Sequence, residues 1–304
     1  MKPIQKELDK ILSHKKEMGI KTGILKLDEF TYGFRKKNLI VVGGCSSVGK
    51  TSLMTDFVIA AAHEVPVGVV SIEMGNQQVI DRMIANIADL NYHRLQKESN
   101  VTEHDRELLE QAKTELLALN DIFFSETHNT MYPDWMLEKK HPENSIEIVM
   151  QDMYDSGARI FFFDYLQLIQ WGFTSESETL RLKNITNKFH DMTLKFDVPI
   201  IILSQLTKAT ADRAHKKDQD PTPTLSDLRD SGYIINDADI VLLIHRPEQY
   251  KKKKESLDLL TDSTEDASII IAKQRNGPVG VVNIEFRAYS MSFANRRRNK
   301  NELF

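Results

Sequence analysis

One short stretch of the sequence has the residue types and spacing to bind the phosphates of a nucleotide. Residues 44–51 read GCSSVGKT, which matches G-x-x-x-x-G-K-[ST], with an apolar run before them and a helical pattern after them. Such a loop can turn backbone N–H groups toward phosphate, and the following helix adds the positive end of its dipole. We expect Lys50 to reach the β- and γ-phosphates and Thr51 to help hold Mg²⁺. The alternative is a glycine-rich turn without a ligand.

The predicted cofactors are therefore ATP and Mg²⁺. We call residues 44–51 the phosphate loop. The residues expected to bind the nucleotide are Gly44, Cys45, Ser46, Ser47, Val48, Gly49, Lys50, Thr51 and Ser52.

Two acidic residues at the ends of apolar runs could complete this chemistry. Asp164 closes the run 160–163, a position from which a carboxylate can bind Mg²⁺ beside a phosphate loop, although it could also merely end the strand. Glu73 follows the run 67–72 and could orient and deprotonate an attacking water. Its alternative is an acid in the first turn of a helix that begins near Gly75.

From residue 38 onward, short apolar runs alternate with helical patterns, which predicts an α/β fold with a mostly parallel sheet flanked by helices. We expect strands at 39–43, 67–72, 122–125, 160–164, 200–204 and 240–245, and helices at 50–63, 75–89, 103–119, 144–156 and 178–196. The segments 267–274 and 279–286 flank Asn-Gly-Pro and predict a C-terminal β-hairpin. Three polar segments, 126–143, 206–224 and 247–266, are expected to be surface loops.

The length alone allows one large domain or two small ones, and the alternation of strands and helices favours one. The chain has 304 residues, of which 41% are hydrophobic and 28% charged, so most of it should fold. We expect an amphipathic helix at 1–19, a nucleotide-binding α/β domain at 20–295 and a basic tail at 296–304. The helix places Ile4, Leu8, Ile11 and Leu12 on one side, and this stripe either folds back onto its own domain or docks on a neighbouring subunit.

Charge, cysteine content and hydropathy exclude several protein classes. With 40 Lys plus Arg against 44 Asp plus Glu, a nucleic-acid site would have to be a local basic surface. The single cysteine, Cys45, excludes an intrachain disulfide framework and fits a reducing compartment, so we expect a cytoplasmic protein. No apolar run is long enough to span a membrane, and residues 1–10 lack the apolar segment of a secretory signal.

Several blocks together resemble the DnaB-type family of hexameric replicative DNA helicases. The resemblance runs from about Thr22 to Asn295 and rests on TGILKLDEFTYGF, the phosphate loop, SIEM at 71–74, FFFDYLQLI at 161–169, IILSQLTK at 201–208, LSDLRDSGYIINDADIVLLIHR at 225–246 and IIIAKQRNGPVGVVNIEF at 269–286. Family members usually carry an additional N-terminal helical domain, which residues 1–18 do not match.

The resemblance implies a RecA-like ATPase that forms a ring of six, encloses single-stranded DNA and separates strands in the 5′ to 3′ direction. It also implies a role for Glu73 as the catalytic base and for Gln205 as the sensor of the γ-phosphate. Lys273 and Arg275 are implied to reach the γ-phosphate bound by the adjacent subunit, Arg275 as an arginine finger. A primase or a helicase loader is a possible further partner.

Single-stranded DNA binding needs positive charge that follows the backbone. The segment after Gln205 offers Lys208, Arg213, Lys216 and Lys217, and it resembles a central-channel loop of the family; a second such loop is expected around 170–179. Arg229 is a further candidate for DNA or subunit contact. The alternative is that these side chains form a solvated surface.

Two other functions stay open on the sequence alone. One is a recombination-type, DNA-dependent ATPase that does not unwind DNA. The other is a nucleotide-dependent helicase-assembly factor.

Overall fold

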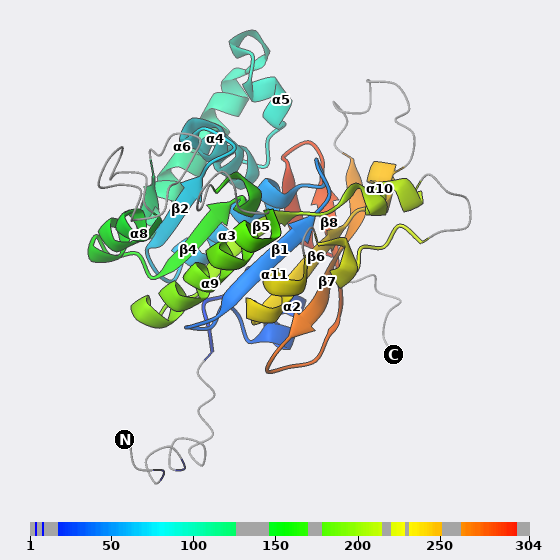
Figure 1. Cartoon of the computed structure of the whole chain (residues 1–304). Coiled ribbons are helices and arrows are strands. Elements are labelled where there is room, and N and C mark those ends of the chain that lie inside the picture. The colour runs from blue at the N-terminus through cyan, green and yellow to red at the C-terminus, as the bar shows by residue number, and fades with distance from the viewer. Residues whose placement is uncertain are drawn as a thin grey trace.

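The structure is a computed structural model. It describes residues 4, 8, 18–125, 146–169, 178–214, 220–228, 231–250 and 263–296. One nine-stranded sheet runs through the centre of the molecule, with the strand order β3-β2-β4-β5-β1-β6-β7-β8-β9 (Figure 1). The predicted α/β fold with a mostly parallel sheet is confirmed.

The first six strands pair in parallel and correspond to the six that the sequence predicts. They are β1 (Leu39–Gly44), β2 (Val67–Ser71), β3 (Ile122–Phe124), β4 (Ile160–Asp164), β5 (Ile200–Gln205) and β6 (Ile240–His245). Every residue of β1, β2 and β4 is buried, as expected for parallel strands covered on both faces. Because parallel strands end at the same edge, the ends of β1, β4 and β5 bring Gly44, Asp164 and Gln205 together there.

The C-terminal part of the sheet is antiparallel. The predicted hairpin consists of β7 (Thr264–Gln274) and β8 (Gly280–Arg287), and β7 joins the sheet beside β6. A third strand, β9 (Ser292–Asn295), was not expected from the sequence and extends the hairpin to a three-stranded meander.

Helices cover both faces of the sheet, because right-handed crossovers place connections that progress in opposite directions on opposite faces. One layer contains α3, which contacts α4, and α4 in turn contacts α6; the other contains α8, α9 and α11, with α9 against α11 (Figure 1). Their bounds are α3 (Lys50–Ala62), α4 (Asn76–Ile87), α6 (Glu103–Ala118), α8 (Ile146–Asp155), α9 (Glu178–Phe196) and α11 (Ser231–Asp237).

Some short elements lie where no regular structure was expected. The segment 206–224 is not only a loop, because α10 (Lys208–Ala214) lies within it and Thr210 is buried there. The other unpredicted elements are α2 (Leu25–Thr31), α5 (Tyr92–Leu95) and the 3₁₀ turns η1 (Glu98–Asn100), η3 (Leu166–Leu168), η4 (Leu225–Asp227) and η5 (Pro247–Tyr250).

The expected N-terminal helix is described only at Ile4 and Leu8, which are helical and exposed. The segment 126–143 lies outside the described residues. Within the described ranges, no helix is both long and apolar enough to cross a lipid bilayer.

Candidate nucleotide site

The phosphate loop connects β1 to α3, as predicted. Gly49 immediately precedes α3 and has φ of 102°, a conformation that favours glycine. Lys50 Nζ donates to the carbonyl oxygens of Gly44 at 3.1 Å and Cys45 at 3.0 Å, so the ammonium lies back over the loop. Burial lowers the pKa of Lys50, and the carboxylates of Asp164 and Glu73 oppose this effect. The loop and these two acids thus form one electrostatic unit.

Two residues that were not expected from the sequence donate hydrogen bonds to carbonyl oxygens of the phosphate loop. Arg246, just after β6, donates to the Val48 carbonyl at 3.1 Å, pairs with Glu265 of β7 at 2.6 Å and stacks on Phe286. Gln249 in η5 donates to the carbonyl of Ser46 at 2.6 Å. These contacts fix the loop backbone in advance of ligand binding, which lowers the ordering cost of binding.

Asp164 lies at the end of β4, fully buried, and faces the start of α3. Its Oδ2 accepts a hydrogen bond from Thr51 Oγ1 at 2.6 Å, whereas its Oδ1 has no hydrogen-bond partner. Burial raises the pKa of Asp164 to about 6, the Thr51 hydrogen bond lowers it, and the nearby Glu73 raises it again. Asp164 Oδ1 is therefore a buried acceptor without a partner beside the phosphate loop.

This raised pKa predicts a stability gain in the Asp164→Asn variant. The unfolded carboxyl titrates near 3.8 and the folded one near 6, so the folded state binds more protons between these values and stability falls as pH rises. Above pH 6 the full cost is about 3 kcal/mol, at about 1.4 kcal/mol per pKa unit. Without nucleotide and Mg²⁺, we expect Asp164→Asn to raise the free energy of unfolding by about 2–3 kcal/mol at pH 8 and progressively less toward pH 4.

Urea unfolding of both proteins across this pH range measures the difference. Asp155→Asn, which replaces an exposed carboxylate of α8, is the matched control and should follow the wild-type protein. An Asp164→Asn variant that is less stable than wild type at pH 8 would contradict the assigned cost of burial.

Glu73 and Gln205 flank this carboxylate. The Glu73 N–H donates to the Asp164 carbonyl at 3.4 Å, and its side chain is exposed at the mouth of the site. Gln205 pairs in register with Gly44 of the phosphate loop, which places it beside the expected phosphates. Gln167, another residue that the sequence analysis missed, accepts from the Gln205 N–H at 3.2 Å and donates to Ser204 Oγ at 3.0 Å. Gln167 thereby joins the end of β5 to the turn that follows Asp164.

Lys273 and Arg275 do not lie with these residues. Arg275 N–H donates to the carbonyl of Asp239, and Asp239 N–H donates to that of Leu39, the first residue of β1. The phosphate loop begins at Gly44, the last residue of β1, and five residues of strand span about 17 Å. The two basic residues therefore lie at the opposite edge of the sheet from their own phosphate loop.

Of the predicted DNA-binding residues, only the side chain of Arg213 is described. Its guanidinium pairs with Asp227 at 2.6 Å and donates to the carbonyls of Asp220 and Thr222. The Thr207 N–H donates to the Asp227 carbonyl, so Arg213 braces the chain just beyond Gln205. The side chain of Lys208 and the whole of Lys216 and Arg229 lie outside the described residues.

Comparisons with known proteins identify the family of the chain. Residues 19–295 match the model of the DnaB-like helicase C-terminal domain. The chain is 32% identical over 283 residues to the replicative DNA helicase DnaC of Bacillus subtilis (strain 168), covering 92% of this chain and 57% of that protein. It is also 32% identical to the replicative DNA helicase DnaB of Geobacillus stearothermophilus, covering 93% of this chain and 58% of that protein.

Solved structures give the same result. One of them, an ATPase domain, superposes with a TM-score of 0.79 at 27% identity. The match covers 97% of this chain and 97% of that domain. A DnaB-like replicative helicase, described with its interactions with primase, has the same TM-score and identity and is covered to 66%. The chain spans about three fifths of the length of the curated relatives it matches. The family model matches most of the chain, and the phosphate loop and the sheet agree with this match, so the chain belongs to the DnaB-like helicase C-terminal domain family.

Proposed function

We propose that this chain is the motor of a ring-forming replicative DNA helicase, which hydrolyses ATP between neighbouring copies and moves 5′ to 3′ along single-stranded DNA. The observation that carries the proposal is the separation of two half-sites on one sheet. The phosphate loop, Asp164, Glu73 and Gln205 gather at one edge, while Lys273 and Arg275 lie at the other. Two copies arranged head to tail would combine opposite edges, and repetition of such a contact closes a ring.

Each residue of the phosphate-loop edge has a role that its position supports. The loop N–H groups and Lys50 would bind the phosphates, with Lys50 exchanging its two carbonyl partners for phosphate oxygens. Glu73, exposed at the mouth of the site, would orient the attacking water and accept its proton. Lys273 and Arg275 of the adjacent copy would stabilise the negative charge on the transferred phosphoryl group.

The residues beside the loop fit Mg²⁺. The described residues contain no cluster of three or more His, Cys, Asp or Glu side chains able to hold a metal on their own. Mg²⁺ in nucleotide sites commonly takes only one or two protein ligands and completes its shell with phosphates and waters. Thr51 and the unpaired Oδ1 of Asp164 would supply the protein ligands. The ion, when bound, neutralises charge on the β- and γ-phosphates.

Gln205, the proposed sensor of the γ-phosphate, would influence DNA binding through the segment that follows it. The bridge between Leu206 and Leu228 and the Arg213–Asp227 ion pair tie this segment to the end of β5. A change at Gln205 would thus move the chain that carries the proposed DNA-binding residues, which are Lys208, Arg213, Lys216 and Arg229. Lys208 and Lys216 would meet backbone phosphates, which makes the binding salt-dependent and tolerant of sequence.

Strand displacement tests the proposal against its alternatives. With ATP and Mg²⁺, we expect assembled rings to unwind a duplex with a 5′ single-stranded tail and to leave a duplex with only a 3′ tail intact. Glu73→Gln rings, which should bind ATP and not hydrolyse it, are the matched control. DNA-stimulated ATP hydrolysis with no displacement of either substrate would favour a recombination-type ATPase, and DNA-independent assembly without turnover would favour an assembly factor.

The oligomeric state tests the same proposal by mass. We expect six copies in the presence of ATP, Mg²⁺ and a single strand, and a strict monomer under every condition would rule out the motor. We also propose that a primase or a helicase loader is a partner of the ring and that the protein acts in the cytoplasm.

A further inference from the structure

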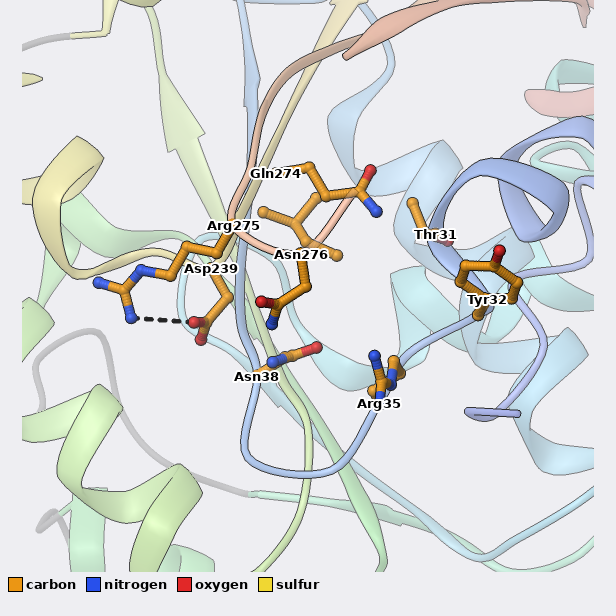
Figure 2. A pocket seen from close by; sticks show the side chains of 9 residues that line it. Thr31, Tyr32, Arg35, Asn38, Asp239, Gln274, Arg275 and Asn276 are labelled. Carbon is orange, nitrogen blue, oxygen red and sulfur yellow. Dashed lines mark hydrogen bonds and ion pairs between the residues drawn. The ribbon is translucent and has the colours of Figure 1, made fainter. Parts of the chain in front are cut away.

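Asp239 is a buried carboxylate beside Arg275, at the start of β6. It is 8% exposed, its Oδ1 pairs with an Arg275 terminal nitrogen at 3.0 Å, and its Oδ2 accepts the Leu39 N–H at 2.9 Å. Figure 2 shows the Arg275 guanidinium turned toward this carboxylate. The Asp239 side chain thus links Arg275, which directly follows β7, to Leu39, the first residue of the strand that leads into the phosphate loop.

The main chain reinforces this link. Asp239 N–H donates to the Leu39 carbonyl at 2.8 Å, and Arg275 N–H donates to the Asp239 carbonyl at 2.9 Å. Main chain and side chain therefore set the position of Arg275 relative to β1 together. A guanidinium held at two points keeps less conformational freedom than one that extends freely into solvent.

The neighbouring helix end holds Lys273 and the rest of Arg275. Lys273 Nζ donates to the carbonyls of Ile235, Asn236 and Ala238, and Arg275 donates from its other terminal nitrogen to the Asn236 carbonyl at 2.6 Å. The last carbonyls of a helix lack partners within the helix and favour cations. Asp239 and the end of α11 together form a cradle for both basic side chains.

Arg275 nevertheless stays available to a partner. Its side chain is 42% exposed, and the contacts described above use only one N–H on each terminal nitrogen. A guanidinium has five N–H donors in a rigid fork, so donors remain on its outer side.

We propose that Asp239 is the positioning residue of the finger: by holding Arg275 against the start of β1, it presents the outer N–H groups to the γ-phosphate site of the adjacent copy. This inference rests on the function proposed above. Asp239 does not touch the nucleotide in this scheme and acts only through Arg275. A displacement of about 1 Å at such a group can reduce the rate by on the order of 100-fold.

Asp239→Asn is the test, because asparagine keeps an acceptor for the Leu39 N–H and loses the charge that pairs with Arg275. We expect kcat for ATP to fall about 10- to 100-fold, with KM and nucleotide binding changed less than about twofold, since the altered group lies at the far edge from the bound ATP. The double variant with Arg275→Ala should be no slower than Arg275→Ala alone, because both changes disable the same group.

Mixed rings show on which side of the interface the defect acts. Where an Asp239→Asn copy provides the phosphate loop and a Glu73→Gln copy provides an intact finger, hydrolysis should proceed, so the mixture should exceed either variant alone. If Asp239 instead served its own phosphate loop through β1, that interface would be defective and no rescue would occur. The reference is a mixture of Arg275→Ala with Glu73→Gln.

The outcomes distinguish a failure of the positioning role of Asp239 from a failure of the proposed function. Failure of the reference mixture would count against catalysis between copies, and thus against the proposed function. Rescue in the reference without rescue by Asp239→Asn would overturn the positioning role alone.

Asp197→Asn is the matched control, since this carboxylate lies just before β5 at the same edge of the sheet, pairs with Lys36 and Lys37 and is not among the partners that hold Arg275 or Lys273. It should keep kcat within about twofold. Equal losses in Asp197→Asn and Asp239→Asn would also overturn the proposal. Melting temperatures and ring mass verify that each variant folds and assembles. If Asp239→Asn does neither, Asp239→Glu, which keeps the charge but moves it by one methylene, should show the same pattern in mixed rings.

Discussion

Lys50→Ala is expected to reduce ATP turnover by at least about 100-fold, because loss of a single preorganised donor to a charged transition state costs about 10²–10³ in rate. Lys50 is the cation at the centre of the site, where its carbonyl partners, Gly44 and Cys45, hold it above the loop. The variant also removes the charge that partly offsets Asp164 and Glu73, so ATP binding should weaken as well. Steady-state phosphate release and binding of a fluorescent ATP analogue measure both effects.

Lys113→Ala is the control for this variant. Lys113 lies on the exposed face of α6, where it pairs with Glu110, and its loss should leave turnover unchanged. Unchanged turnover in Lys50→Ala itself would remove the basis for the phosphate site, because no other described lysine lies on the phosphate loop. The same measurement at several ATP concentrations separates weaker binding from slower chemistry.

Sequence patterns predicted the half of this site that depends on buried strands. The runs that became β1, β4 and β5 are mainly apolar and end in Gly44, Asp164 and Gln205, so their common edge followed from parallel pairing. The position of Asp164 at the end of a strand could be predicted from the sequence. The shift of its pKa could not, because burial and the Thr51 hydrogen bond depend on how α3 packs over β4.

The supporting residues had no such pattern. Arg246 reaches the phosphate loop only because β6 ends beside β1, and Gln249 lies in a polar segment expected to be a loop. Seven-residue helices such as α10 and α11 are too short to be stable alone, so local pattern predicts them poorly and tertiary contacts decide them. The cradle around Arg275 depends on α11, and for this reason Asp239 could not be recognised from sequence.

Arg275→Ala should slow hydrolysis by about 10³-fold or more while ATP binding stays nearly intact, as is typical for arginine fingers. The physical reason is that Arg275 lies about 17 Å along the sheet from its own phosphate loop, so that in the proposed ring its charge would act on the transition state at the neighbouring copy. Single-turnover hydrolysis in preassembled rings is the direct measurement. Arg287→Ala, which removes an arginine paired with Asp89, should leave the rate unchanged.

Mixing Arg275→Ala with Glu73→Gln tests whether Arg275 acts on the phosphate loop of the adjacent copy. Each variant alone lacks one half of every interface, whereas a mixed ring contains interfaces with an intact Glu73 on one copy and an intact Arg275 on the next. At equal amounts and random assembly, about a quarter of the interfaces combine both intact halves, so the rate should approach a quarter of wild type if sites act independently. Strict cooperation among all sites would hold the rate below that fraction, and a verified mixed ring with no gain over the separate variants would mean that Arg275 acts within its own copy or not in catalysis.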